Sequence, residues 1–410
     1  MTDDARPWRV LLVDDDPMVL RLMARLLRKA QPSWTVETAE RGAQALEAMG
    51  RMPFDAVVSD LDMPGMRGST LLEVVAERHP GTLRLIHSGS VQLEHNLEAA
   101  AVSHQFHGKP AAPQGLVAAL ERVHRLRSTL RDPRLQALVA RIDRLPSIPQ
   151  VYERLLAEMR APEPSLRNVG RIIAEDVAMT AKVLQLVNSA LFGLRSRVAD
   201  PVQAAAVLGL NTLRTLVLGL ELFSGFRGDD VARRHVERLW HHSTAAAGLA
   251  RRIASTPRRE RAVADEAFLA GMVHDVGKLV LWSALPTEYA EVHEAAFGDR
   301  RLLHDVEQEC FGAHHGQVGA YLLALWGFET PTIDAVGWHH RPEAGITADD
   351  GFTPLAAVHV ADALVHRHDP GSCSAEVPID AGYLAHAGLD GQLPVWESLS
   401  QGEDALRETG

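Results

Sequence analysis

Short apolar runs alternate with helix-like segments over the first 126 residues of the chain. The apolar runs lie at residues 9–14, 34–39, 54–60, 83–89 and 103–109. Between them, segments such as 17–30 and 41–50 place apolar residues at the spacing of an amphipathic helix. Strands that alternate with helices form a parallel sheet covered by helices on both faces. The pattern therefore predicts a doubly wound α/β domain with five parallel strands.

Beyond a short polar linker at 127–133, strand patterns stop and helical spacing continues, which predicts an all-α domain over 134–369. Residues that commonly cap helices mark the expected helix starts at Ser165, Asp200, Asn211 and Asp265. Gly209 predicts the end of the helix that follows Asp200. The acidic stretch 370–410 has few apolar positions, and we expect short helices or loops there, packed on the all-α half or trailing it.

The stretch MVHDVGKLVL (272–281) places His274 and Asp275 inside a strongly apolar run. The helix expected from Asp265 would include both residues. A helix turns about 100° per residue, so the two side chains would share one ion only at the flank of that helix. A buried imidazole and carboxylate need partners, and this stretch is therefore a candidate site.

Composition narrows the class of protein. The chain has 410 residues, more than one ordinary core holds, and its 46% hydrophobic and 23% charged content is typical of a soluble globular protein. It has no apolar run of about 18 residues and no secretion-like start, which favours the cytoplasm and no membrane contact. The two cysteines fit a reducing compartment.

The net charge of −11 is concentrated near the end of the chain. Residues 343–410 contain 2 Lys+Arg and 12 Asp+Glu, which gives a local charge of −10. Such a segment repels phosphates, and no basic recognition helix stands out elsewhere, so nucleic acid is an unfavourable partner. Most of the 20 histidines fall between residues 235 and 368, where we expect a site.

Polar residues end four of the five predicted strands. Asp14–Asp16 follow the first strand and Asp60 ends the third, while Ser88 and Lys109 end the fourth and fifth. The carboxyl ends of parallel strands meet at one edge of the sheet, where ligands bind. Clustered carboxylates suit Mg²⁺, and a metal, a hydroxyl and an ammonium around one carboxylate can accept and hold a phosphoryl group.

This arrangement, with its xxDxxMPG segment and Lys-Pro pair, resembles the receiver domain of two-component response regulators over residues 8–126. The resemblance implies that a sensor histidine kinase phosphorylates Asp60. It also implies that Asp14 and Asp15 hold Mg²⁺, that Ser88 and Lys109 contact the phosphoryl group, and that Phe106 is the aromatic switch residue.

The second half resembles the HDOD domain, the HD-related output domain of bacterial signalling proteins. Stretches such as LPSIPQVYERLLAEM, FLAGMVHDVGKLVL and AVGWHHRPE carry the resemblance over about residues 135–345. The family's catalytic constellation is often incomplete. The resemblance therefore favours a largely non-catalytic output domain that signals to an unidentified downstream protein through protein contacts, with a homodimer as one option.

A second hypothesis is a metal-dependent phosphohydrolase, gated by phosphorylation, that acts on a nucleotide or cyclic nucleotide. HD-type phosphohydrolases bind metal through residues that match His242, His274, Asp275 and Asp362. This nitrogen and oxygen set suits Mn, Fe, Zn or Ni. A second metal would be bound by His315, His339 and His340. A metal-free remnant of such a site is an alternative for the first four residues, and a DNA-binding regulator is the third hypothesis. No GYP segment follows the His339–His340 pair, which argues against cyclic di-GMP hydrolysis of the HD-GYP type.

Overall fold

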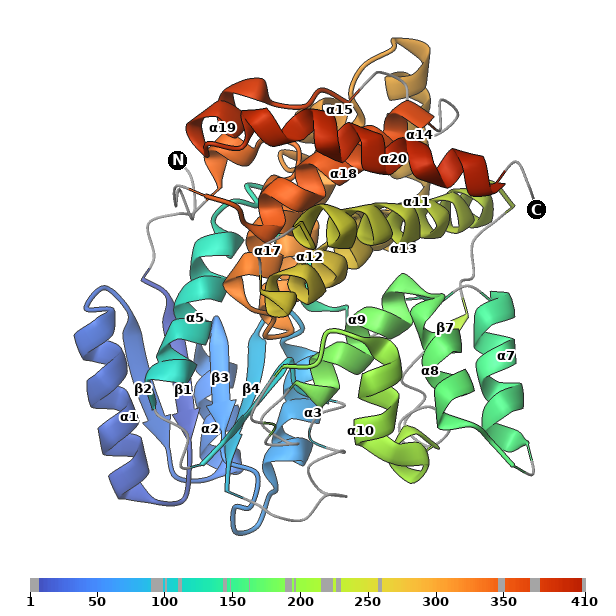
Figure 1. Cartoon of the computed structure of the whole chain (residues 1–410). Coiled ribbons are helices and arrows are strands. Elements are labelled where there is room, and N and C mark those ends of the chain that lie inside the picture. The colour runs from blue at the N-terminus through green and yellow to red at the C-terminus, as the bar shows by residue number, and fades with distance from the viewer. Residues whose placement is uncertain are drawn as a thin grey trace.

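The structure is a computed structural model, and we describe it over residues 7–89, 99, 102–109, 113–142, 146–147, 149–161, 163–188, 194, 197–214, 224–225, 230–256, 260–345, 351–368 and 377–407. Figure 1 shows an α/β region formed by the first part of the chain and a larger helical region above and beside it. The part of the helix predicted from Asn211 that lies beyond Arg214 falls outside the described residues.

The α/β region is a five-stranded parallel sheet in the order β2-β1-β3-β4-β5. Its strands are β1 (Arg9–Val13), β2 (Thr35–Ala39), β3 (Ala56–Ser59), β4 (Leu83–Ser88) and β5 (Gln105–Gly108). Its described helices are α1 (Pro17–Ala30), α2 (Gly42–Arg51), α3 (Gly68–Arg78) and α5 (Pro113–Arg127). The predicted fold class is confirmed, with strand ends that differ from the expected ones by two residues at most.

Alternate residues of β1 show why this sheet has helices on both faces. Val10 and Leu12 belong to one buried apolar cluster, together with residues of α1 and α5. Leu11 and Val13 belong to another, together with residues of α2 and α3. Successive side chains of a strand point to opposite faces, so a strand that is apolar throughout needs cover on both sides.

The rest of the described chain is helical apart from one short parallel pair, β6 (Pro146–Ser147) and β7 (Ser224–Gly225). The helices up to the middle of this region are α6 (Pro133–Ala140), α7 (Pro149–Arg160), α8 (Leu166–Ala174), α9 (Val177–Val187), α10 (Pro201–Arg214) and α11 (Asp230–Ala254). The later ones are α12 (Arg261–Val273), α13 (Val276–Ala284), α14 (Pro286–Gly298), α15 (Leu303–Phe311), α16 (His315–Leu325), α17 (Thr330–Trp338), α18 (Pro354–His368), α19 (Ala381–His386) and α20 (Leu393–Arg407). Two 3₁₀ turns, at Pro342–Ala344 and Asp390–Gln392, complete the list.

Local capping explains several of these helix ends. The Ser165 side chain accepts a hydrogen bond from the Asn168 amide at 3.4 Å, as expected for the cap of α8. Asp200 accepts from the Val202 amide at 2.7 Å at the start of α10. Gly209 has φ 74° and interrupts α10, which confirms the predicted stop and uses a backbone conformation that glycine adopts freely.

The helix predicted from Asp265 is wrong in one important respect. α12 already begins at Arg261 and ends at Val273, and a new helix, α13, begins at Val276. Asp275 has φ −99° and ψ 11°, outside the helical region, so His274 and Asp275 lie at a turn rather than within one helix. A Cβ on Gly277 would lie 1.9 Å from the His315 carbonyl oxygen, so only glycine allows α13 to approach α16 this closely.

The end of the chain lies on the helical region. Trp396 of α20 is fully buried and belongs to a cluster with residues of α11, α12 and α18. Figure 1 shows α20 lying across these helices. The acidic segment therefore contains a longer helix than expected, because apolar residues such as Trp396 give it one buried side.

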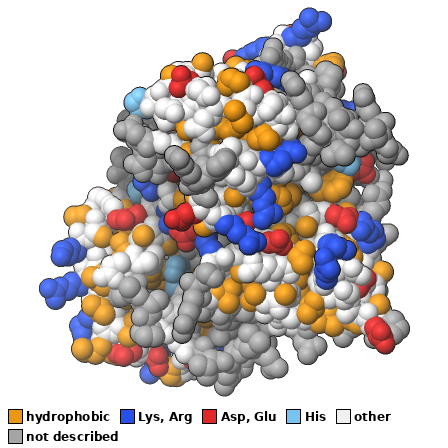
Figure 2. Space-filling view, in the orientation of Figure 1, with side chains coloured by type: hydrophobic (Ala, Val, Ile, Leu, Met, Phe, Trp, Pro, Cys, Tyr) orange, Lys and Arg blue, Asp and Glu red, His pale blue; other side chains and the backbone are white. Residues whose placement is uncertain are grey.

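The two halves share a continuous core. One buried cluster includes Leu120 of α5, Leu135 of α6 and Leu323 of α16. Figure 1 shows α5 running from the sheet toward the helical region. Among the described residues, no helix is long and apolar enough to span a membrane. On the face in Figure 2, basic and acidic side chains are interspersed.

Candidate functional site

Two buried carboxylates and one lysine form the site at the sheet edge. Asp14 follows β1, Asp60 follows β3 and Lys109 follows β5. The Lys109 ammonium donates to Asp14 Oδ2 at 2.6 Å and to Asp60 Oδ1 at 2.7 Å. Burial lowers the pKa of Lys109, but the hydrogen bonds to the two carboxylates outweigh it and raise that pKa above its ordinary value.

The backbone around Asp60 is held closely. Asp60 Oδ2 accepts the Asp62 amide at 2.9 Å. A Cβ on Gly68, the first residue of α3, would lie 2.0 Å from the Asp60 carbonyl oxygen, so glycine is required there. Asp60 is therefore presented on a tight loop at the end of β3, with its side chain toward Lys109.

The other predicted receiver residues lie on the same strands or beside them. Ser88 ends β4 and is buried, and its carbonyl accepts the Lys109 amide at 2.8 Å. Phe106 lies in β5 and is 7% exposed, in the cluster that contains Leu11 and Ile86. Asp15 is exposed at the end of β1.

A second cluster lies deep in the helical half and gathers imidazoles and carboxylates from three places in the chain. His242 comes from α11, His274 and Asp275 from the turn between α12 and α13, and Asp362 from α18. His242 Nε2 lies 3.1 Å from His274 Nε2 and 2.9 Å from Asp362 Oδ1. Asp275 Oδ2 lies 3.4 Å from His274 Nε2 and 3.8 Å from His242 Nε2.

These separations are those of ligands around one ion. Nitrogen and oxygen ligands lie about 2.0–2.2 Å from a transition metal, so neighbouring ligands are about 3.0–3.4 Å apart. The His274 Nδ1 lies 2.7 Å from the Gly271 carbonyl, to which it donates, and this leaves Nε2 with its lone pair toward the other ligands. Burial and the neighbouring His366 lower the pKa of His242 to about 4, so its imidazole is neutral and can bind metal at neutral pH.

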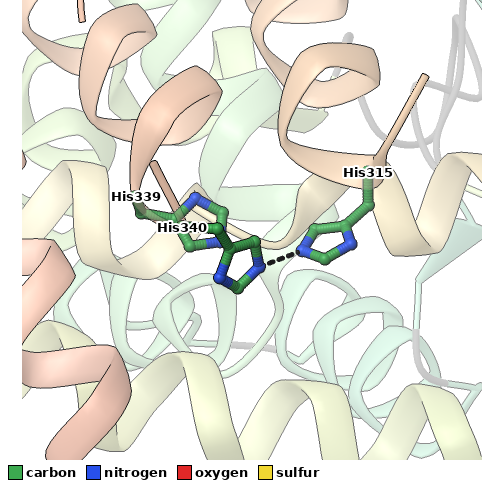
Figure 3. A group of neighbouring side chains, drawn as sticks. All are labelled: His315, His339 and His340. Carbon is green, nitrogen blue, oxygen red and sulfur yellow. Dashed lines mark hydrogen bonds between the residues drawn. The ribbon is translucent and has the colours of Figure 1, made fainter. Parts of the chain in front are cut away.

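A second group of three histidines lies beside the first. His315 is the first residue of α16, and His339 and His340 follow the last residue of α17. Figure 3 shows the rings of His315 and His340 pointing toward one another, with 2.8 Å between their Nε2 atoms, and His339 next to His340. Burial holds the pKa of His339 and of His340 well below its ordinary value, which keeps both rings neutral.

Asp275 connects the two groups. Its Oδ2 faces His242 and His274, whereas its Oδ1 lies 3.2 Å from His315 Nε2 and 3.8 Å from His339 Nε2. The Lys278 ammonium donates to Oδ2 at 2.6 Å. Burial alone would raise the pKa of Asp275, but His274, Lys278 and His315 hold it well below its ordinary value, so the carboxylate is ionised.

Sequence reasoning missed three supporting residues. Glu307 of α15 accepts from the His315 Nδ1 at 2.6 Å and from the Tyr289 hydroxyl at 2.6 Å. Its contacts with His315 hold the pKa of Glu307 at about 2, even though burial favours the neutral form. The His366 Nδ1 lies 2.9 Å from Asp362 Oδ1. The spacing of Asp362 and His366, four residues apart on α18, was a usable signal, whereas nothing in the sequence ties Tyr289 or Glu307 to His315.

The donor set fits two divalent ions. His339 Nε2, His340 Nδ1 and Asp362 Oδ2 are buried and make no hydrogen bond to any described residue. Buried polar atoms without partners are unfavourable, and several of them converging on one point indicate a cation. The first group would hold one ion and the second group the other, with one Asp275 oxygen for each.

A cavity of about 420 Å³ opens on this cluster. Its lining combines potential metal ligands with the cations Lys278 and Arg238, the carboxylate Glu294 and apolar residues such as Phe297 and Leu303. A cavity of this size with a mixed lining admits a small molecule that has a charged part and an apolar or planar part.

Comparisons with known proteins agree with this division of the chain. A family model described as "Response regulator receiver domain" matches residues 10–121, and one described as "HDOD domain" matches residues 145–342. The chain is therefore a response regulator of a two-component system, with an N-terminal receiver domain and a C-terminal HDOD domain.

Individual relatives match parts of the chain. An uncharacterized protein of Treponema pallidum (strain Nichols) is 28% identical over 202 residues, which is 48% of this chain and 39% of that protein. The transcriptional regulatory protein GlrR of Escherichia coli (strain K12) is 41% identical over 76 residues, which is 18% of this chain and 17% of that protein. The match thus spans less than half of the length of either curated relative.

Among solved structures, the chain is similar to the MmoQ response regulator of Methylococcus capsulatus. The match covers 62% of this chain and 98% of that chain, with 25% sequence identity and a TM-score of 0.46.

Proposed function

We propose that the receiver domain takes a phosphoryl group onto Asp60 from a sensor histidine kinase. The support is geometric: Asp60 is fixed on a tight loop, and Lys109 joins it to Asp14. The oxygens of Asp14, Asp15 and Asp60 would hold Mg²⁺, which suits hard oxygen ligands. The phosphoryl group would then add charge that Lys109 and Ser88 are placed to meet.

We propose further that the HDOD domain binds two divalent ions and hydrolyses a phosphoester. The observation that carries this proposal is Asp275, which turns one oxygen toward each of two groups of buried imidazoles. Mn, Fe, Zn or Ni would suit these ligands. When bound, such ions act as Lewis acids toward phosphoryl oxygens and lower the pKa of a bound water.

The protein's own residues would supply the remaining requirements. Lys278 and Arg238 in the cavity lining can each donate charged hydrogen bonds to a phosphate. Glu307 orients His315, and apolar residues of the lining such as Phe297 and Leu303 would contact the rest of the substrate. A nucleotide or cyclic nucleotide has the required combination of a phosphate and a planar apolar part.

An output that acts only through protein contacts is the alternative. It is favoured by the large shared core between the two domains, in which α5, α6 and α16 pack together. It does not explain why so many polar atoms are buried facing one another. For this reason the hydrolytic proposal is the stronger one.

One experiment separates the two proposals for the HDOD domain. Purified full-length protein is stripped of metal, reloaded with Mn²⁺ or Zn²⁺ and assayed against nucleotide and cyclic nucleotide phosphoesters. We expect turnover by the wild type and none by His242→Ala. The matched control is His241→Ala, because His241 is the neighbouring histidine of α11 but is exposed and contacts the Trp240 ring. A protein that binds no Mn²⁺ or Zn²⁺ on reloading and shows no turnover would support an output that acts only through protein contacts.

The receiver proposal has its own test. A small phosphodonor with Mg²⁺ should label the wild type and leave Asp60→Ala unlabelled. Asp62→Ala is the control, since Asp62 is an exposed carboxylate two residues away. Equal labelling of the wild type and Asp60→Ala would overturn the assignment of Asp60.

A further inference from the structure

We infer that the hairpin formed by α16 and α17 connects the receiver strand β5 to the second group of metal ligands. The inference rests on the proposed function and adds the way in which the receiver would regulate that site. It depends on three properties of the hairpin: where its bend docks, how rigid it is, and what its two free ends hold.

The bend of the hairpin docks on β5. The Gln105 side chain, the first residue of β5, donates to the Ala324 carbonyl in the last turn of α16 at 2.8 Å. Carbonyls in the last turn of a helix lack partners within that helix, so Gln105 caps α16. Gly327 continues the bend with φ 75°, and a Cβ on it would lie 3.3 Å from the Gln105 side chain.

A second receiver element holds the same bend. Arg122 of α5 donates to the Phe328 carbonyl at 2.5 Å. Its guanidinium also lies 3.9 Å from the Glu329 carboxylate, at the residue that precedes α17. The bend is therefore fixed to β5 and α5 together, by hydrogen bonds to the Ala324 and Phe328 carbonyls and by the ion pair with Glu329.

β5 also belongs to the phosphorylation site. Lys109, which binds Asp14 and Asp60, follows β5 directly, and Gln105 is the strand's first residue. Phe106 lies between them and packs in the receiver core. If Lys109 shifts to meet a phosphoryl group and Phe106 repacks, the strand that carries Gln105 shifts with them.

The hairpin is built to move as one body. Its two helices approach so closely that a Cβ on Gly316 would lie 2.8 Å from the Val336 carbonyl oxygen. A Cβ on Gly337 would lie 3.2 Å from the Ala320 Cβ. Close-packed helices transmit a displacement rather than absorb it. α16 has 11 residues, which corresponds to a length of about 16 Å.

Both free ends of the hairpin carry the second ligand group. His315 begins α16, and His339 and His340 follow α17. The first ligand group comes from α11, α18 and the turn before α13, which are outside the hairpin. A displacement of the bend would therefore change the position of His315, His339 and His340 relative to Asp275. His339 also lies close to the first group, with its ligand atom within 4.8 Å of those of His274 and Asp362, so the same displacement reaches that group through His339.

Metal titration of the full-length protein tests this inference. Mn²⁺ affinity is measured with and without beryllofluoride, a phosphoryl mimic, in the presence of Mg²⁺. We expect the mimic to change the affinity for one of the two ions by about 5–150-fold. Gln105→Ala, and independently Arg122→Ala, should abolish most of that change.

Gln185→Ala is the matched control. Gln185 of α9 donates to the His104 carbonyl at 2.9 Å, so it too joins the two domains at β5 by one glutamine hydrogen bond, but from a helix that carries none of the proposed ligands. The change in affinity should persist in Gln185→Ala. A change of equal size in the wild type and in Gln105→Ala with Arg122→Ala combined would overturn the inference.

A readout without transition metal keeps this inference distinguishable from the proposed hydrolase. Amide hydrogen exchange of the protein stripped of transition metal should change in α16 and α17 when beryllofluoride is added together with Mg²⁺, in the wild type but not in Gln105→Ala. If that change occurs and no metal binds, the hydrolase proposal fails and the connection stands. If two ions bind and exchange in α16 and α17 does not respond, the connection fails and the hydrolase proposal stands.

Discussion

The receiver site and the histidine cluster are both buried polar sites, but they balance their charges in opposite ways. In the receiver, Lys109 offsets one of the two negative charges of Asp14 and Asp60 through two short hydrogen bonds. In the cluster, imidazoles face each other and face carboxylates, and Lys278 contacts only one oxygen of Asp275. A site in which a lysine pairs with the carboxylates is stable without a bound ligand. A site in which lone pairs converge is completed by a cation from outside.

Removal of transition metal should have the largest effect on the unfolding free energy, and it should act through the histidine cluster rather than the receiver site. Ions held at 100 to 1,000 times their dissociation constants stabilise a folded state by about 3–4 kcal/mol each. We therefore expect Mn²⁺ or Zn²⁺ to raise the unfolding free energy of the metal-free protein by several kcal/mol, as measured by denaturant titration. Asp275→Asn should lose this gain, since Asp275 contacts both ligand groups. A gain of equal size in Asp275→Asn would contradict the bridging role.

The corresponding change in the receiver removes its internal cation. Lys109→Met leaves Asp14 and Asp60 buried next to each other without their partner. Removing one partner of a buried ion pair is strongly destabilising, and because Lys109 is 24% exposed we expect a reduced loss of about 1–2 kcal/mol. Millimolar Mg²⁺ should restore part of this loss in Lys109→Met and have a smaller effect on the wild type. Equal effects of Mg²⁺ on both proteins would show that the two carboxylates do not form a cation site.

Glu307 offers a finer test of the histidine cluster. It is fully buried and fixes the orientation of His315. Partners of this kind typically contribute 10–100-fold to metal affinity, so Glu307→Gln should weaken one of the two ions by about that factor. Tyr289→Phe removes only the hydrogen bond to Glu307 and should weaken the same ion less. Isothermal titration with Mn²⁺ would measure the affinity of both variants. If Glu307→Gln weakened the ion of the first ligand group instead, the assignment of Glu307 to the second group would be wrong.

The last test concerns the pH dependence of stability at the domain contact. His107 of β5 is hydrogen-bonded to Gln105, and burial lowers its pKa to about 4 from an ordinary value of 6.5. Below pH 6.5, His107 is therefore protonated in the unfolded chain but stays neutral in the folded chain until the pH approaches 4. Stability is lost as the pH falls from 6.5 toward 4. Denaturant titrations of the metal-free protein across this range should show a weaker loss for His107→Gln. An unchanged pH dependence would mean that His107 does not contribute.

The receiver was easier to predict than the HDOD domain for a physical reason. Asp60 and Lys109 end parallel strands, and the carboxyl ends of such strands meet at one edge whatever the details of packing. The ligands of the histidine cluster come from helices, whose relative positions depend on packing that no local pattern encodes. The sequence therefore indicated which histidines to group, but not that Asp275 would face both groups.

The error at His274 and Asp275 has the same origin. The apolar periodicity from Asp265 onward is continuous, and it predicts one helix. The break after Val273 follows from the approach of α13 to α16 at Gly277, which is a contact between segments about forty residues apart in the chain. Tyr289 and Glu307 were missed for this reason too, since only the folded chain brings them to His315.

The number of divalent ions that the full-length protein binds tests the central claim most directly. After metal stripping, reloading with Mn²⁺ or Zn²⁺ and removal of free metal, elemental analysis should find about two ions per wild-type chain. We expect about one ion in His315→Ala, which loses a ligand of the second group only, and none in Asp275→Ala. A wild-type protein that retains no transition metal while remaining folded would contradict the account.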